Sequence, residues 1–202
     1  MSSVKATMRL ENSFRRDGKL FVCGIDEVGR GCLAGPLVAA AVILPASWHK
    51  ALKDSKLLSS QMREELNSYI LEKSSASGFG WVDNNEIDEY GLTEAVRQAY
   101  LRALEDMGAG FSVAVIDGNY NYLDEYEIAQ TVIKGDQKVS CVAAASIIAK
   151  VARDKYMSEQ SQRYPEYDFV NNFGYGTKKH REALLGKGLT NLHRKSFCRA
   201  FV

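Results

Sequence analysis

The chain has 202 residues, of which 46% are hydrophobic and 25% are charged. These values are those of one globular domain with a sizeable core, and they exclude a disordered or fibrous chain. The net charge of +1 hides an asymmetry, because residues 134–202 carry 13 Lys or Arg against 6 Asp or Glu, a net +7, and residues 1–133 carry a net −6. A basic region beside an acidic one fits a protein that binds a polyanion on one side and a metal ion on the other, although solvated helix faces would give the same charges.

The cysteines and the apolar runs indicate the cellular compartment of the chain. The four cysteines have no CxxC spacing, which argues against a zinc site and favours buried thiols in a reducing compartment. The longest apolar run, residues 37–44, is far too short to span a bilayer, and the N-terminus lacks the apolar stretch of a signal peptide. We therefore expect a cytoplasmic monomer that makes no membrane contact.

The first half of the chain predicts strands separated by one helix. Residues 20–25 and 37–44 are apolar runs joined by a turn that is tight enough for an antiparallel pair. A helix begins at Ser59 or Ser60, a residue type that caps helix N-termini, and repeats its apolar residues with helical spacing. Residues 77–82 form a third strand, which is weakened by its glycines.

The second half alternates helices and strands. It contains, in order, a helix with an apolar face that includes Tyr100 (residues 93–107), two strands (111–116 and 128–133), a long helix rich in alanine (139–156), a loop (166–180) and a short helix near 181–185. The chain has no internal repeat and no linker. This order predicts a single α/β domain over residues 1–202, with residues 1–18 as a tail or short helix.

A pair of carboxylates follows the first strand. Asp26 and Glu27 come directly after it, and a turn with three glycines around Arg30 comes next. Two carboxylates at the mouth of such a turn would repel a phosphate unless a hard divalent cation lay between them. A solvated acidic turn is the alternative. Adjacent residues of a regular strand face opposite ways, so we expect the strand to end or bulge at this pair.

Two further strands also end beside a carboxylate and a glycine. Asp117 precedes Gly118, and Asp136 follows Gly135. The ends of neighbouring strands converge on one edge of a sheet, where α/β folds usually place their sites. A cluster of four negative groups needs a neutralising metal ion. The pattern therefore predicts a metal site of Asp26, Glu27, Asp117 and Asp136.

The sequence also resembles the ribonuclease HII family. The resemblance rests on segments spread in order over about residues 20–197, namely residues 26–31 (DEVGRG), 33–36 (LAGP), 54–56 (DSK), 117–118 (DG), 134–136 (KGD), 144–154 (AASIIAKVARD), 174–177 (GYGT) and 193–197 (HRKSF). The related ribonuclease HIII family typically has a lysine between the two glycines and a sizeable N-terminal domain. Here Arg30 stands between the glycines, which favours ribonuclease HII over a ribonuclease HIII-type enzyme.

The resemblance implies a fold and an activity. The fold would be a ribonuclease H-like mixed sheet flanked by helices, with a small helical C-terminal extension, and residues from about 157 to 202 would contact substrate. The activity would be endonucleolytic cleavage of the RNA strand in RNA–DNA hybrids and at single ribonucleotides in duplex DNA. Asp26, Glu27, Asp117 and Asp136 would be catalytic and would bind two Mg²⁺ or Mn²⁺ ions, leaving a 3′-hydroxyl and a 5′-phosphate.

Several residues are predicted to bind the nucleic acid. The resemblance places Gly29, Arg30, Gly31 and Tyr175 around the 2′-hydroxyl and the adjoining deoxyribose, and close backbone groups suit a hydroxyl that both donates and accepts. Helical spacing puts a serine and two cations on one face, which indicates phosphate contacts by Ser146, Lys150 and Arg153. The alternative is a solvated face on which Lys150 pairs with Asp154.

The remaining cations and histidines are less specific. Lys56 neighbours an acidic motif residue and is either a phosphate contact or a salt-bridge partner. The three histidines have no ligand spacing, so surface or packing roles are expected for them. Two other functions fit the sequence less well. A non-catalytic nucleic-acid-binding module is disfavoured by the intact carboxylates, and a nucleotide-binding enzyme by the lack of a GxGxxG or GxxxxGK[ST] motif.

Overall fold

The structure of this protein is a computed structural model, which describes residues 5–53 and 58–201. Two short 3₁₀ helices, Pro165–Tyr167 and Arg199–Phe201, lie near the C-terminus. The other elements, in chain order, are β1 (Lys5–Ala6), α1 (Arg9–Arg16), β2 (Val22–Val28), β3 (Leu37–Ile43), β4 (Leu52–Lys53), α2 (Ser60–Lys73), β5 (Ala76–Val82), α3 (Asn84–Tyr90), α4 (Leu92–Met107), β6 (Val113–Asp117), β7 (Ala129–Val132), α5 (Gly135–Lys138), α6 (Ser140–Ser161), α7 (Phe169–Asn172) and α8 (Lys178–Lys187).

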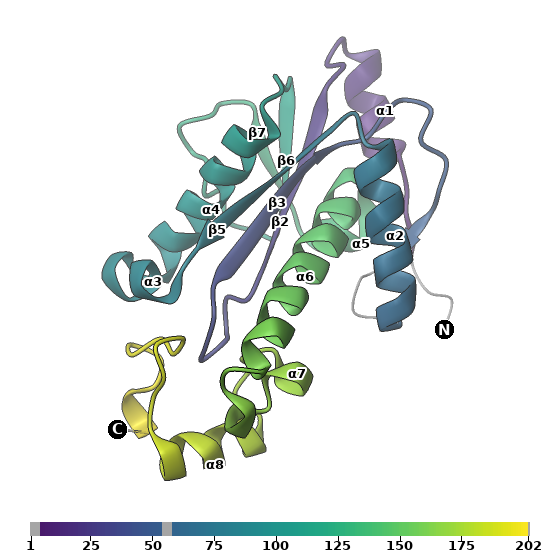
Figure 1. Cartoon of the computed structure of the whole chain (residues 1–202). Coiled ribbons are helices and arrows are strands. Elements are labelled where there is room, and N and C mark those ends of the chain that lie inside the picture. Colours follow the sequence, from purple (N-terminus) through teal and green to yellow (C-terminus); the bar gives the residue numbers. More distant parts are fainter. Residues whose placement is uncertain (1–4, 54–57, 202) are drawn as a thin grey trace.

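The centre of the fold is a mixed sheet with the strand order β5-β3-β2-β6-β7. The predicted antiparallel pairing of β2 with β3 is confirmed, and β5 continues it on the far side of β3. By contrast, β6 lies parallel to β2, and β7 lies parallel to β6. The C-terminal ends of β2 and β6 therefore meet at the same edge of the sheet (Figure 1).

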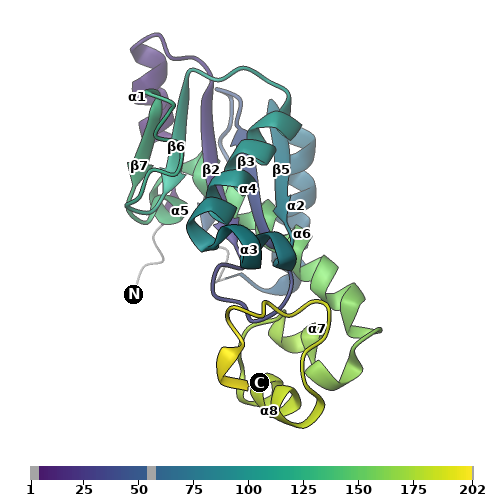
Figure 2. The same cartoon turned by 90° about the vertical axis from the view of Figure 1, so that its left-hand side faces the viewer.

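Helices cover both faces of the sheet, as predicted. One face packs against α6, α2 and α1, and the other packs against α4 and α3 (Figures 1 and 2). Glycines in the strands allow this close packing, because a Cβ at Gly24 would lie 2.2 Å from the Cys141 carbonyl carbon, and one at Gly80 would lie 1.8 Å from the Ala99 oxygen. The glycines that weaken the third strand by propensity are thus what lets α4 approach it.

Several elements differ from the sequence prediction. The first strand runs three residues further than expected, to Val28, and residues 84–90 form α3, which begins with a capping box from Asp83 and Glu86. Of the two alternatives predicted for residues 1–18, a short helix is present as α1, and its Glu11 accepts a hydrogen bond from the backbone N–H of Cys141 at the start of α6. The expected loop after Pro165 contains the short helix α7.

The C-terminal residues form a small helical extension with a core of its own. The 3₁₀ helix after Pro165, α7 and α8 surround buried residues that include Tyr167 and Phe169, beyond the end of the β2–β3 pair (Figure 2). Isolated bridges from Cys32 to Tyr175 and from Ala34 to His193 join this extension to the glycine-rich turn. Among the described residues, no helix is both long and apolar enough to cross a membrane.

Candidate active site

Strand β2 carries its two carboxylates on opposite faces. The strand neither ends nor bulges at this pair, so that expectation is wrong: Asp26 pairs with Ala40 and Glu27 with Ala39 in regular antiparallel register. Gly24 faces α6, and Asp26, two residues later, faces the same side. Glu27 faces α4. Both side chains still reach the cleft, because they lie at the edge where the sheet ends.

Asp26 is held in an environment that disfavours its negative charge. Its side chain is 7% exposed, and its carboxylate accepts hydrogen bonds from the Glu27 N–H at 2.8 Å and from the Ser146 hydroxyl on α6. Burial is the main cause that raises the pKa of Asp26 well above its ordinary value, and the negative charges of Glu27 and Asp117 raise it further. A bound cation would offset both effects by its attraction to the carboxylates.

Glu27 is held by two donors from different elements. Its Oε1 pairs with the Arg30 guanidinium at 3.1 Å, and its Oε2 accepts a hydrogen bond from the hydroxyl of Tyr100 on α4. Burial, together with the negative charge of Glu27, raises the pKa of Tyr100 well above its ordinary value. Tyr100 was not predicted from the sequence as a site residue. Helical spacing assigns it to the apolar face of its helix and does not show which group its hydroxyl contacts.

Asp117 ends β6 next to the Asp26 strand. Its Oδ1 accepts a 2.6 Å hydrogen bond from the N–H of Gly135, so the start of α5 is tied to the end of β6. Asp136 follows in the first turn of α5, is 5% exposed and does not line the cleft that the other three carboxylates share. Its role as a fourth ligand stays a prediction.

The cleft brings together most of the residues predicted from the sequence. Its volume is about 310 Å³. Its lining residues are Asp26, Glu27, Val28, Gly29, Arg30, Gly31, Asp117, Ser146, Lys150 and Tyr175. The acidic strand ends, the glycine-rich turn, one face of α6 and the aromatic loop therefore surround a single space.

Lys150 and Tyr175 form one wall of this cleft. The Lys150 ammonium pairs with Asp154 at 2.8 Å, and it also lies 5.6 Å from the centre of the Tyr175 ring. The pairing that the sequence offered as an alternative is thus present, in a lysine that also lines the cleft. The Tyr175 ring is 39% exposed, so it remains accessible to a ligand.

Arg153 does not share this surface, and its prediction as a phosphate contact is wrong. The side chain is fully buried, and its guanidinium donates to the carbonyl oxygens of Pro36 at 2.8 Å, Phe173 at 2.8 Å and Ala34 at 3.1 Å. The helical spacing is correct, but the glycine-rich turn and the aromatic loop cover this end of the helix face. Arg153 therefore joins these two segments to α6.

Arg194 supports the same turn from the C-terminal extension. It is fully buried and donates to the carbonyl oxygens of Arg30 at 2.9 Å and Gly35 at 2.9 and 3.0 Å. Burial lowers the pKa of Arg194 to about 10. The side chains of His180 and His193 are also buried in this extension, with their Nε2 atoms 3.0 Å apart, which confirms a packing role for both. The predicted contact Lys56 lies outside the described residues.

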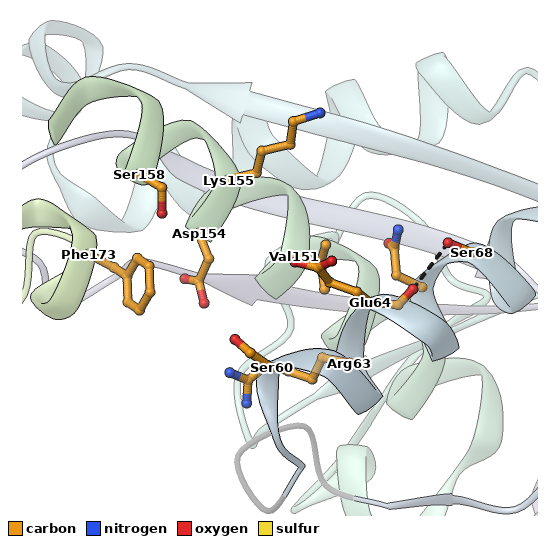
Figure 3. A pocket seen from close by; sticks show the side chains of 10 residues that line it. Ser60, Arg63, Glu64, Ser68, Val151, Asp154, Lys155, Ser158 and Phe173 are labelled. Carbon is orange, nitrogen blue, oxygen red and sulfur yellow. Dashed lines mark hydrogen bonds between the residues drawn. The ribbon is translucent and has the colours of Figure 1, made fainter. Parts of the chain in front are cut away.

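A larger cavity of about 470 Å³ lies between α2 and α6 (Figure 3). Asp154 and Phe173 face Ser60 and Arg63 across it. Its lining carries both signs of charge, with Lys155 and Glu64 as further members, and it contains none of the acidic strand ends. The larger volume of this cavity therefore does not make it the active site, and the smaller cleft with the carboxylates is the better candidate.

The donors in the cleft fit a hard divalent cation. Asp26, Glu27 and Asp117 supply only carboxylate oxygens, which Mg²⁺ and Mn²⁺ prefer. Burial first, and then the negative charges of Glu27 and Asp117, raise the pKa of Asp26, so a cation there would be favourable. Within residues 5–53 and 58–201, no group of three or more His, Cys, Asp or Glu side chains is already arranged to hold a metal ion. Metal binding would therefore draw these carboxylates together.

Comparison with known proteins identifies close relatives. A sequence model of the family described as ribonuclease HII matches residues 23–200. The ribonuclease HII of Leuconostoc citreum is 45% identical over 190 residues, which cover 92% of this chain and 72% of that protein. The structure of the ribonuclease H2 from Pyrococcus horikoshii has a TM-score of 0.77 and 26% identity, and covers 90% of this chain and 96% of that one. Bst-RNase HIII in complex with Mn²⁺ matches with a TM-score of 0.68 and 21% identity, over 89% of this chain and 62% of that one, which supports the fold alone.

Proposed function

This chain belongs to the ribonuclease HII family and is a ribonuclease H, and from this premise we propose that it cuts the RNA strand of RNA–DNA hybrids and single ribonucleotides in duplex DNA with two divalent metal ions. The observation that supports the two-ion mechanism is the shared cleft of Asp26, Glu27 and Asp117. The membership also sets aside the ribonuclease HIII alternative. The monomeric state and the cytoplasmic location stay predictions.

The carboxylates would hold the metal ions, Mg²⁺ or Mn²⁺. Asp26 and Asp117 approach from the α6 side of adjacent parallel strands, and Glu27 approaches from the α4 side. Asp136 would complete the set from α5. The chemistry that divalent ions supply at such a site is activation of water and stabilisation of the departing 3′ oxygen in an in-line displacement. The expected products carry a 3′-hydroxyl and a 5′-phosphate.

The glycine-rich turn would recognise the ribose. A Cβ at Gly31 would meet no protein atom within 4 Å, whereas one at Gly29 would lie 2.4 Å from the Arg153 Nε. Packing thus explains Gly29, but nothing in the described protein crowds Gly31. The open space suits a sugar pressed against the backbone, where N–H and C=O groups can test a 2′-hydroxyl.

Lys150 and Ser146 would act on the phosphates and on Asp26. The Lys150 ammonium lines the cleft next to the aromatic loop, and from there it would contact the backbone phosphate at the cut. Ser146 keeps the Asp26 carboxylate oriented. The excess of positive charge in residues 134–202 supports a salt-dependent approach of the duplex.

Tyr175 would distinguish a single ribonucleotide from a continuous RNA strand. Its exposed ring stands over the cleft and can pack on the sugar 3′ of the cut nucleotide. Such stacking is worth roughly 1–3 kcal/mol, which corresponds to a loss of about 5- to 150-fold in kcat/KM for Tyr175→Ala. The loss should be greater for an embedded ribonucleotide, which a deoxyribose follows, than for a uniform hybrid.

The proposal is tested with a labelled DNA duplex that contains one ribonucleotide, incubated with and without Mg²⁺. We expect one cut at the ribonucleotide, only with the metal, with 3′-hydroxyl and 5′-phosphate ends. Gly31→Ala tests the recognition of the ribose separately, because this variant should keep the stability of wild type and lose most of the cleavage. Cleavage of hybrids but not of the single-ribonucleotide duplex would refute the wider substrate range. Metal-independent cleavage would refute the mechanism.

A further inference from the structure

The Glu27 carboxylate differs from its two partners in the direction from which it reaches the cleft. Asp26 and Asp117 both lie on the α6 face of the sheet, and Asp26 is oriented there by Ser146. Glu27 lies on the opposite face, where regular strand geometry directs its side chain toward α4. A carboxylate in this position needs a support on the α4 side if it is to meet the same cation.

Tyr100 supplies that support from a rigid position. Its side chain is completely buried, and its ring packs edge-on against Tyr122 with the ring centres 5.7 Å apart. The core between α4 and the sheet, and not the hydrogen bond itself, therefore fixes the ring. The hydroxyl at its tip donates to Oε2 of Glu27.

The other partner of Glu27 is less constrained. The Arg30 side chain is 48% exposed, and its guanidinium lies 5.6 Å from the centre of the Tyr122 ring. Arg30 also belongs to the turn that would receive the ribose, so substrate can compete for its guanidinium. Substrate cannot draw Tyr100 away from Glu27, because its ring is fixed in the core. Tyr100 therefore remains the permanent donor to Glu27.

We propose that Tyr100 is a positioning residue, whose hydroxyl holds Glu27 so that its carboxylate reaches the cation shared with Asp26 and Asp117 from the opposite face of the sheet. This inference rests on the proposed metal site. Hydrogen-bond partners of metal-ligating side chains orient the ligands, and their loss typically costs 10- to 100-fold in metal affinity. Tyr100→Phe removes only the donor, because the ring and its packing against Tyr122 are kept.

The test measures Mn²⁺ affinity in the absence of nucleic acid, by calorimetric titration of the metal alone into the whole chain. Four proteins are compared with wild type: Tyr100→Phe, Glu27→Gln, the double variant, and Tyr122→Phe as the matched control in the neighbouring ring. We expect Tyr100→Phe to raise the Mn²⁺ Kd by about 10-fold or more. Tyr122→Phe should leave the Kd unchanged, and the metal-free melting temperature of Tyr100→Phe should stay close to that of wild type.

The double variant tests whether Tyr100 acts through Glu27. Once Glu27→Gln has removed the ligand, adding Tyr100→Phe should cause no further loss of affinity. An equal loss in both backgrounds, or a wild-type Kd for Tyr100→Phe, would overturn the positioning role while leaving the metal site intact. A wild-type Kd for Glu27→Gln would overturn the ligand assignment and the inference with it.

Discussion

Replacement of Arg153 by methionine tests whether this residue braces the fold or binds nucleic acid. The wild-type guanidinium is fully buried and donates to three carbonyl oxygens, those of Pro36, Phe173 and Ala34. Methionine keeps most of the apolar stem but offers no donor. The expected result is a loss of stability, because three buried acceptors lose their partner at once.

The magnitude follows from those three acceptors. A buried carbonyl left without a donor costs about 1–3 kcal/mol. The low end of this range applies, because the shorter side chain can admit water, so the three carbonyl oxygens together cost about 3 kcal/mol. For a chain of this size 1 kcal/mol corresponds to about 2–4 °C in Tm. We therefore expect Arg153→Met to melt about 6–12 °C below wild type.

The assay is urea and thermal unfolding of the metal-free protein, and Lys150→Met is the matched control from the same helix. Lys150 lines the cleft and pairs with a single carboxylate, that of Asp154, so its loss should cost less stability than the loss of the three Arg153 hydrogen bonds. Lys150→Met should instead weaken hybrid binding and flatten its dependence on salt. Wild-type stability for Arg153→Met, together with a flattened salt dependence, would refute the bracing role.

Three further predictions concern burial and charge. Because folding raises the pKa of Asp26, the free energy of unfolding of the metal-free protein should fall as pH rises from about 4 through that raised pKa. In urea unfolding, the stability of Asp26→Asn should depend less on pH and should exceed that of wild type at about pH 7. A cleavage assay should show the same variant to be nearly inactive. Gly24→Ala would place a Cβ 2.2 Å from the Cys141 carbonyl carbon, so denaturant unfolding should show a loss of about 1–3 kcal/mol; wild-type stability would contradict this packing. All four cysteines are buried and burial raises the pKa of Cys23 to about 12, so a thiol reagent should label the folded protein far more slowly than the unfolded one.

The sheet and its acidic ends could be predicted because they depend on local patterns. Apolar runs that end in a carboxylate and a glycine identify the strands of Asp26 and Asp117, and the short connection after Asp26 requires an antiparallel neighbour. The meeting of these two carboxylates then follows from the parallel pairing of their strands. That pairing, which joins residues 22–25 to residues 113–116, is the one distant contact on which this part of the prediction depends.

The remaining features depend on contacts that spacing does not encode. Arg153 and Lys150 look alike on a helical face, yet chain segments more than a hundred residues away bury the first and leave the second in the cleft. Tyr100 looks like a core aromatic, and only the packing of α4 on the sheet brings its hydroxyl to Glu27. The expected bulge at Glu27 is absent, and Glu27 reaches the cleft from the α4 face of the sheet, where Tyr100 donates a hydrogen bond to it.

The most direct test of the metal site is the anomalous diffraction of Mn²⁺ in crystals of this chain soaked with the ion. We expect an anomalous peak in the cleft, at ligand distance from the carboxylates of Asp26, Glu27 and Asp117. The same soak of Asp117→Asn should weaken or abolish that peak. A wild-type crystal in which Mn²⁺ binds elsewhere and leaves these three carboxylates without a metal ion would contradict the account.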